Sequence, residues 1–498
     1  MSTRFHNAVV WSAFGEPLQS ELTIDDGIVV SNDVDADEFV DCLGATILPA
    51  FIDGHSHPTI AAKESLGPDV TRCKSVAEVV TAVLDWVTSN EDAKWAIGGA
   101  YDRSMAADAV FQAEWLDQVE IPVVLHANDH HSVWVNSATI MACGLTGADL
   151  THFPGVAQDA QGKIIGTFFE TDAKDLILSH APLVNESNLE SALARKLDLM
   201  ASLGVVATLD AWASQEDANR YARLNHNLEV EVAQWVQPAT WKDFTGEAKT
   251  IKFFLDGVLG SKTACVSEPY VEQGTHGQAV WESQELLQAL RHFNALGLRL
   301  HLHAIGDAAV DSAIDAISEI ELISPATLVH AELLRDDQLS QLAHLDLYIC
   351  AQPLWARRDS LSAGALANLP ESQHALLYRN RDLLTCGIKL SFGSDWPVSS
   401  PDPLLGIFTA LHRRTPEQSP DDALNPSQAI SLEQALHAYT AGAANQIGLN
   451  RSATLNTGSR ADFVVLDKNP FDDNGLSLPN TQVIKTVSGG KTLFARHS

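Results

Sequence analysis

The stretch Leu48-Pro-Ala-Phe-Ile-Asp-Gly-His-Ser-His-Pro58 is an apolar run that ends in two histidines separated by one residue. Residues two apart on an extended strand project from the same face, so His55 and His57 are expected to lie side by side at a strand end. A divalent cation about 2 Å from each imidazole could contact both rings. The stretch therefore predicts a strand that carries part of a metal site.

Seven further segments have the composition of short buried strands, and amphipathic helical segments separate several of them. These strand segments are residues 204–210, 229–235, 251–256, 298–303, 326–330, 347–351 and 388–392. Alternating strands and helices are typical of a parallel sheet covered by helices. With the first strand they make eight, the number that closes a TIM barrel. We therefore predict an α/β fold with a (β/α)8 barrel over residues 49–444.

Two parts of the chain depart from this repeat. Roughly 150 residues separate the first two strands, far more than an ordinary strand-to-helix connection, so residues 60–202 are expected to form an inserted α/β subdomain. Short β-branched segments occur near both ends of the sequence. Residues 1–48 and 445–498 are therefore predicted to form one discontinuous β-sandwich.

The composition excludes several classes of partner. The 498 residues carry a formal net charge of -32, which repels phosphate backbones and anionic membranes. No apolar run has the length of a membrane span, and the first residues do not resemble a secretory signal. The six cysteines form no Cys-x-x-Cys pair, as expected in a reducing compartment. We expect a cytoplasmic protein with a small-molecule substrate and no nucleic-acid or membrane partner. A homo-oligomer is compatible with this composition.

Polar residues mark the ends of several predicted strands, where active sites lie in such barrels. Lys252 lies in the fourth strand, His303 ends the fifth, His330 ends the sixth, and Asp395 follows the eighth. His301 alternates with His303 and is a rival ligand from the same face. Histidine and carboxylate groups that meet at one rim indicate a metal site.

The joint order of these motifs resembles the amidohydrolase superfamily, and within it the amidohydrolase type 3 family that includes N-substituted formamide deformylase. The resemblance rests on residues 51–57, 251–257, 303–307, 330–332, 393–397 and 458–466. It implies one or two divalent metal ions, with zinc as the first choice. By this resemblance, His55 and His57 bind the first metal, and His303 and His330 bind the second. Lys252, carboxylated by carbon dioxide to a carbamate, would bridge the metals, and Asp395 would bind the first metal and relay protons.

Elementary chemistry agrees with these implied roles. A lysine ammonium has no lone pair for a metal, so Lys252 makes sense as a ligand only as a carbamate. Two neighbouring cations lower the pKa of a bridging water and polarise a carbonyl. A carboxylate such as Asp395 could accept the proton of the water and return it to a leaving nitrogen.

Residues outside the metal motifs are candidates for substrate contact. Within the insertion, His131 lies in a polar and aromatic run that resembles a substrate-facing segment of the family, and Asp102 is a weaker candidate. Trp355 follows the seventh strand and Trp396 follows Asp395, so both could line the pocket with aromatic rings.

The favoured function is therefore metal-dependent hydrolysis of a carbon-nitrogen bond other than a peptide bond. By the resemblance, a metal-bound hydroxide would attack an amide-type group, of the N-acyl or N-formyl kind. One alternative is a mononuclear deaminase of the same superfamily, although the Gly306-Asp307 pair stands where deaminases typically carry a glutamate. The other alternative is a barrel that binds without catalysis, which the full set of ligand positions disfavours.

Overall fold

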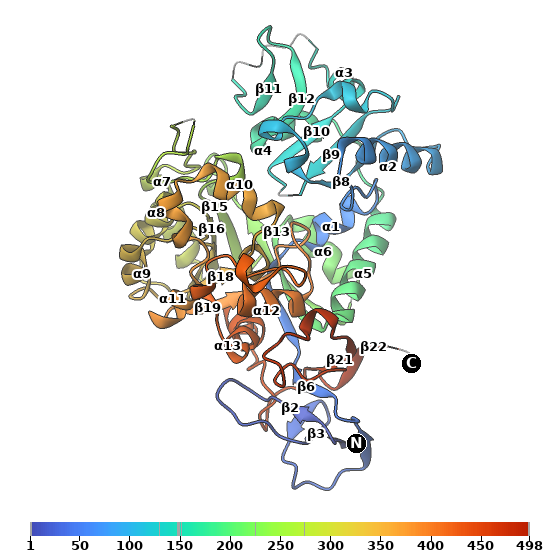
Figure 1. Ribbon diagram of the computed structural model, residues 1–498, viewed down its shortest axis with the longest axis vertical. Coiled ribbons are helices and arrows are strands. Elements are labelled where there is room, and N and C mark those ends of the chain that lie inside the picture. The colour runs from blue at the N-terminus through green and yellow to red at the C-terminus, as the bar shows by residue number, and fades with distance from the viewer. Residues whose placement is uncertain are drawn as a thin grey trace. The chain divides into compact units, whose positions relative to one another are not determined.

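The computed structural model describes residues 2–128, 130–146, 150, 152–224, 226–272 and 274–496. The chain divides into two compact units, one of residues 1–57 with 197–498 and the other of residues 58–196. Figure 1 shows the elements of both units. No described helix is long and apolar enough to cross a membrane.

The larger unit is built on a sheet of eight parallel strands in the order β19-β18-β17-β16-β15-β14-β13-β7. Every predicted barrel strand is present. The strands are β7 (Phe51–Ser56), β13 (Val205–Ala213), β14 (Glu229–Trp235), β15 (Thr250–Phe254), β16 (Arg299–Ala304), β17 (Ala326–His330), β18 (Leu347–Ala351) and β19 (Lys389–Phe392). Neighbours along this order pair in parallel, which confirms the prediction of a TIM-type barrel.

The two outer strands of this sheet meet directly beyond their carboxyl ends. The Asp395 amide donates to the His55 carbonyl at 2.7 Å, and the His57 amide donates to the Trp396 carbonyl at 2.6 Å. Gly393 permits this approach, because a Cβ atom there would lie 2.5 Å from the His55 nitrogen. The sheet therefore closes at the segments that carry predicted ligands.

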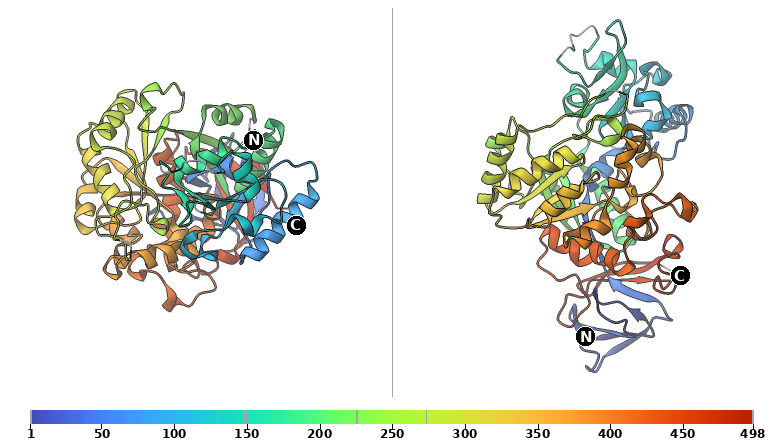
Figure 2. Two further views of the ribbon diagram at one scale, coloured as in Figure 1. Left: turned by 90° about the horizontal axis from the view of Figure 1, so that it is seen from above. Right: turned by 60° about the vertical axis from the view of Figure 1, so that its left-hand side comes forward.

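Helices follow the barrel strands and pack on the outside of the sheet, as Figures 1 and 2 show for the yellow and orange segments. They are α6 (Gln215–Leu224), α7 (Ser283–Ala295), α8 (Asp307–Ser318), α9 (Asp336–Leu342), α10 (Ser360–Asn368), α11 (Asn380–Thr385), α12 (Pro403–His412), α13 (Leu432–His437) and α14 (Ala443–Ile447). In α7 the apolar residues Leu286, Leu290 and Phe293 recur at helical spacing and are buried. Such a stripe turns one helix face toward the sheet.

Two small sheets complete the larger unit. One has the order β4-β3-β1-β5 and the other the order β2-β6-β20-β21-β22, so the second combines strands from both ends of the chain. Their strands are β1 (Thr3–His6), β2 (Val9–Val10), β3 (Leu22–Asp25), β4 (Ile28–Val30), β5 (Glu38–Asp41), β6 (Thr46–Pro49), β20 (Phe463–Leu466), β21 (Val483–Ser488) and β22 (Lys491–Ala495). Phe5, Leu22, Ile47, Phe463 and Val487 share one buried cluster.

The smaller unit contains a sheet of its own, in the order β11-β12-β10-β9-β8. Its strands are β8 (Ala96–Tyr101), β9 (Val123–Ala127), β10 (Ser132–Val135), β11 (Val156–Gln158) and β12 (Ile164–Phe169). Its helices are α1 (Pro58–Glu64), α2 (Val76–Ser89), α3 (Ser137–Ala142) and α4 (Glu170–Leu178), and α5 (Glu186–Ser202) continues past residue 196. Val79, Val83, Phe111 and Trp134 belong to a buried cluster of this unit.

Candidate metal centre

Three predicted ligands meet where β7 and the segment after β19 come together. His55 Nε2 lies 3.2 Å and His57 Nε2 lies 2.8 Å from Asp395 Oδ1. Suitable ligand atoms of all three residues lie within 4.8 Å of one another, and all three residues are buried. Two imidazoles and one carboxylate at these separations match the donor set that proteins use for zinc and related divalent ions.

The Asp395 carboxylate is in an unusual electrostatic position. Burial raises its pKa, but the nearby His55 and His57 outweigh this effect and hold the pKa well below its ordinary value. Oδ1 nevertheless accepts no hydrogen bond of good geometry from the described residues, despite its short distances to both imidazoles. A buried anion without a hydrogen bond at this atom costs free energy, and a cation between the three groups would remove that cost. The residues present therefore fit a divalent metal.

His55 is oriented by a histidine from the fifth barrel strand. Its Nδ1 lies 2.7 Å from His301 Nε2, and the two rings stack with centroids 5.0 Å apart. Burial is the largest cause of a pKa well below the usual value in both residues, so both rings are neutral at pH 7. Since one nitrogen must donate to the other, His301 occupies Nδ1 of His55 and leaves Nε2 facing Asp395.

His303 and His330 form a second pair of imidazoles, with ring centroids 4.6 Å apart. His303 Nε2 lies 3.1 Å from the Gly257 carbonyl, to which it donates, so in the neutral ring Nδ1 is the nitrogen with the lone pair. His330 Nδ1 lies 2.7 Å from Gln352 Oε1, which leaves the lone pair on Nε2. His330 also lies 5.2 Å from the His55 ring, which connects this pair to the first group.

Lys252 is buried within the barrel, on β15. In the register of the sheet it pairs with His301 of β16. Burial lowers the pKa of Lys252 to about 7, although the Asp395 carboxylate opposes this shift. Its Nζ lies 4.7 Å from the centroid of the Phe254 ring. A substantial fraction of the side chain is thus the neutral amine at neutral pH.

Four further polar residues lie near the ligands. Three of them, Asp53, Asp210 and Asp256, were given no role from the sequence, whereas Gln352 belongs to the loop after the seventh strand that the sequence offered as a weaker candidate. Asp53 accepts from the Ser394 hydroxyl at 2.6 Å, and Asp210 Oδ1 lies 3.9 Å from His57 Nδ1. Asp256 Oδ1 lies 3.5 Å from His303 Nε2, and Gln352 contacts His330 as described. Asp210 and Asp256 each end a predicted strand segment, which is a signal that could have drawn attention to them.

Gly54 has a role other than the tight turn that glycine often indicates. It lies within β7, and a Cβ atom there would be 2.4 Å from Gln446 Oε1 and 2.9 Å from the Phe392 carbonyl oxygen. The position thus requires glycine because neighbouring groups fill the space of a side chain.

The predicted substrate residues occupy different places. The Trp355 ring stacks on His330 at 5.2 Å, and Trp396 is buried next to Asp395. His131 and Asp102 lie in the unit of residues 58–196. His131 Nδ1 lies 2.9 Å from Glu170 Oε2, and the Asp102 carboxylate accepts from the Ser104 amide as a helix cap.

Partly exposed aromatic side chains, which the sequence did not single out, flank both histidine groups. Trp212 lies 6.4 Å from the His57 ring, and Phe254 lies 4.9 Å from the His303 ring. Trp212, Trp235 and Phe254 contact one another with centroids 5.1 to 6.0 Å apart. We call these three residues the aromatic wall.

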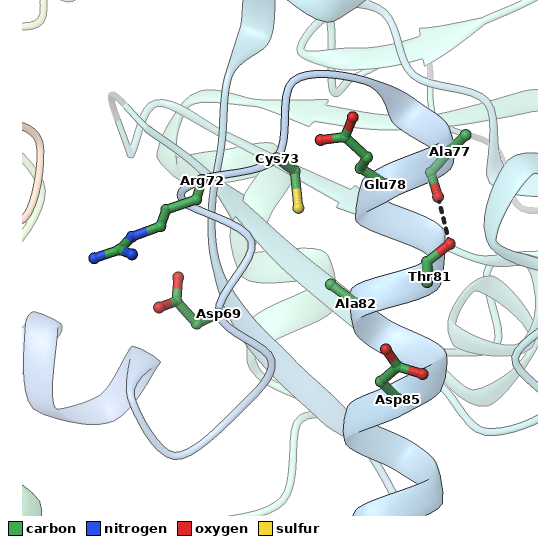
Figure 3. Close-up of a pocket in the computed structure, with 8 residues that line it drawn as sticks. All are labelled: Asp69, Arg72, Cys73, Ala77, Glu78, Thr81, Ala82 and Asp85. Atoms are coloured by element: carbon green, nitrogen blue, oxygen red, sulfur yellow. Dashed lines mark hydrogen bonds between the residues drawn. The ribbon is translucent and has the colours of Figure 1, made fainter.

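A pocket in the unit of residues 58–196 lies apart from these predictions. Figure 3 shows Asp69, Arg72 and Cys73 facing one side of helix α2, from which Glu78 and Asp85 project. Three of its eight lining residues are acidic and Arg72 is basic. None of them was predicted to contact substrate or metal.

Comparisons with known proteins identify the family of this chain. A family model described as the amidohydrolase family matches residues 38–494. YtcJ of Bacillus subtilis, named as an amidohydrolase, is 26% identical over 480 residues, which cover 91% of this chain and 90% of YtcJ. N-substituted formamide deformylase of Arthrobacter pascens is 24% identical over 506 residues, which cover 92% of this chain and 90% of that enzyme.

The fold of the chain is also similar to that of solved structures. An uncharacterized metal-dependent hydrolase from Pyrococcus furiosus has a TM-score of 0.73 and 25% sequence identity, and the match covers 94% of this chain and 100% of that one. A second such hydrolase, from Pyrococcus horikoshii, has a TM-score of 0.75 and 22% identity, and the match covers 95% of this chain and 99% of that one. The family match spans nearly the whole sequence, and the chain therefore belongs to the amidohydrolase family of hydrolases.

Proposed function

We propose that the protein hydrolyses a carbon-nitrogen bond of the amide type with the help of one or two divalent metal ions. The observation that carries this proposal is the convergence of His55 Nε2 and His57 Nε2 on Asp395 Oδ1. The similarity to an N-substituted formamide deformylase supports a substrate of the N-formyl or N-acyl kind.

The proposed ligands divide into two groups by the contacts that their nitrogens make. His55 Nε2, His57 Nε2 and an Asp395 oxygen would hold one metal. His303 Nδ1 and His330 Nε2 would hold another, because their opposite nitrogens are already engaged by Gly257 and Gln352. A divalent metal, when bound, supplies Lewis-acid chemistry that acidifies water and polarises a carbonyl.

Lys252 is proposed to join the two groups as a carbamate. The neutral amine attacks carbon dioxide, forms a carbon-nitrogen bond and loses one proton, which leaves an anionic carbamate. The low pKa of about 7 supports this role, since the reactive free amine is well populated. Conversion to the carbamate also prevents Lys252 from carrying a buried positive charge, which lowers the pKa values of His55, His301 and His330.

Asp395 is proposed to move the proton. Its depressed pKa keeps the carboxylate ionised at neutral pH, which is the form that accepts a proton from the attacking water. Protonated Asp395 would then deliver that proton to the leaving nitrogen as the carbon-nitrogen bond breaks. The carboxylate is regenerated, so one residue acts first as base and then as acid.

The substrate is proposed to carry an apolar group on nitrogen. The aromatic wall is partly exposed beside both histidine groups, where it could contact such a group, and Trp355 and Trp396 add buried aromatic surface near them. His131 and Asp102 remain proposed substrate contacts of lower weight, because His131 Nδ1 already contacts Glu170 and Asp102 Oδ1 already accepts from the Ser104 amide.

The domain boundaries are also proposals. We assign residues 1–48 and 445–498 to a β-sandwich, residues 49–444 to the barrel and residues 60–202 to an insertion within it. The buried cluster shared by strands of both small sheets supports the sandwich. The compact unit of residues 58–196 supports an insertion with nearly these limits.

The decisive experiment combines metal analysis with a panel of N-formyl and N-acyl amines that differ in their N-substituent. We expect at least one zinc per chain and release of the free amine. Asp395→Asn should lower kcat about 100-fold or more, because a general acid-base group typically contributes that much. Asp315→Asn, an exposed change on α8, serves as the matched control.

The outcomes separate the alternatives. Well under one metal per chain would reject a metal-dependent hydrolase. Ammonia release from amino-substituted heterocycles, with no cleavage of the amide panel, would indicate a deaminase instead. Near wild-type turnover by Asp395→Asn would remove the proton-transfer role of that residue.

A further inference from the structure

A second cluster of metal-binding residue types lies in the unit of residues 58–196. Glu64 is the last residue of α1, His126 lies on β9, and His130 lies in the connection between β9 and β10. One ligand atom from each residue lies within 4.8 Å of the other two. None of these residues is among the predicted metal ligands of the barrel, although His130 lies next to His131 in the polar and aromatic run that resembles a substrate-facing segment of the family.

The separations within the cluster match those between ligands of one metal. Glu64 Oε1 lies 3.6 Å from His130 Nε2, which is longer than an ordinary hydrogen bond. Two ligand atoms each about 2.0 to 2.1 Å from a tetrahedral zinc lie about 3.3 Å apart. The His126 and His130 rings have centroids 5.9 Å apart and an interplanar angle of 32°. A small movement of the side chains would bring all three groups onto one ion.

The cluster is enclosed rather than displayed on the surface. The side chains of His130 and Glu64 are only 9% and 10% exposed. A Cβ atom at Gly99 of β8 would lie 2.7 Å from Glu64 Oε1 and 3.3 Å from the His126 Cβ, so this strand forms a wall of the cluster. Glu64 Oε1 has no hydrogen-bond partner among the residues that the structure describes. A buried carboxyl oxygen without a hydrogen bond costs free energy, and a bound cation would offset that cost.

The charge state of the cluster suits a cation. Burial raises the pKa of Glu64 to about 8, although the positive charge of Lys196 opposes this shift, and burial together with the charge of Lys174 lowers the pKa of His126 to about 4. Without a cation, a neutral carboxylic acid therefore faces a neutral imidazole. A bound metal would displace the carboxyl proton and use lone pairs that the neutral histidine already presents.

We propose that Glu64, His126 and His130 form a second metal site, separate from the barrel, that binds one divalent transition metal such as zinc. Two histidines and one glutamate leave the fourth tetrahedral position to water. The site would tie the end of α1 to the connection that also carries His131. The His130 carbonyl is already fixed from the other side, since it accepts from Lys174 Nζ at 2.5 Å.

The pocket of Figure 3 lies near this site. Asp69 of that pocket pairs through its backbone with Gly99, the residue that walls the cluster. Glu78 and Asp85 face the same pocket from helix α2 (Figure 3).

The test uses the 498-residue chain prepared with zinc, because the metal bound at the barrel site and at the second site can then be measured in the same sample. Glu64→Gln is the decisive variant, since glutamine has the shape and neutrality of the protonated acid but binds zinc poorly. His126→Asn is the second variant. Glu120→Gln and His152→Asn, which change exposed residues of the same unit, are the matched controls.

We expect metal analysis to find about one zinc fewer per chain in Glu64→Gln and in His126→Asn, and no loss in either control. Anomalous diffraction at the zinc edge should place a peak among Glu64, His126 and His130 in the wild type and not in Glu64→Gln. Circular dichroism and thermal unfolding verify that Glu64→Gln is folded.

Equal zinc content in Glu64→Gln and wild type, with no anomalous peak at the cluster, would overturn this site. The peak beside His55 and His57 in the same map reports separately on the barrel. Loss of one peak without the other therefore shows which of the two proposals has failed.

Discussion

Two histidines on the same face of strand β16 make different contacts. His301 and His303 both point into the barrel, and sequence spacing cannot choose between them as ligands. The structure gives His301 a nitrogen contact with His55, whereas His303 donates to a carbonyl and keeps a lone pair on Nδ1. These contacts favour His303 as the ligand and His301 as the residue that orients His55.

This division of roles predicts different responses to matched substitutions. His303→Asn should lower the zinc content by up to about one ion per chain, because a ligand is lost. His301→Asn should retain most of the metal, since an amide can still exchange a hydrogen bond with His55 Nδ1. Metal analysis of the two variants side by side measures this. The reverse order of metal loss would make His301 the ligand.

Lys252 gives a second prediction at this scale. Protein incubated with ¹³C-bicarbonate should show a carbamate carbon resonance in NMR spectra, because its amine is buried and has a pKa of about 7. The resonance should be missing in Lys252→Met, while the exposed Lys468→Met should keep it as the control. A wild-type spectrum without any carbamate signal would rule out the bridging role.

Among the elements, strands were more predictable than the contacts they make. Each barrel strand was expected within a few residues, because apolar β-branched runs between turn residues are a local property. The fourth strand segment was predicted to reach Asp256, but β15 ends at Phe254. The Asp256 carboxylate instead accepts from the amides of Ile305 and Gly306, beyond the end of β16. Hydrogen bonds between distant segments thus help to determine where a strand near the site ends.

Helix α12 offers a prediction that depends on pH. Its N-cap Asp402 accepts from the Leu404 amide, and burial raises the pKa of this carboxyl above its ordinary value of 3.8. The folded state therefore holds the proton more tightly, and the stability that this provides is present below pH 3.8 and lost as the pH rises through the folded pKa. Asp402→Asn keeps a capping oxygen without the charge, so it should stabilise the protein at pH 7 but not at about pH 4.

Urea unfolding of wild type and variant at the two pH values measures this difference. Asp402→Ala is the companion variant, and it should cost about 1 kcal/mol at pH 7, because the cap itself is lost. A destabilising effect of Asp402→Asn at pH 7 would show that the charged cap outweighs its burial.

At the scale of the whole molecule, metal binding and stability are linked. A metal that binds only the folded chain adds about 4 kcal/mol when its concentration is a thousand times Kd. Chelation should therefore lower Tm and abolish activity, and zinc should restore both more effectively than magnesium, which disfavours imidazole ligands. Differential scanning calorimetry with and without chelator measures the shift. In His55→Asn the Tm change should be smaller, and an unchanged Tm in chelated wild type would contradict the linkage.

The sequence by itself determined the eight barrel strands, the family and the set of candidate ligands. These depend on local periodicity and on polar residues at strand ends, both of which are visible along the chain. The tertiary structure alone decided which contacts the nitrogens of His55, His303 and His330 make, why Gly54 must be glycine, and where the aromatic wall lies. It also brought Glu64 to His126 and His130 across some sixty residues of sequence. Such contacts depend on strand register and packing between distant segments, which no local pattern of residues specifies.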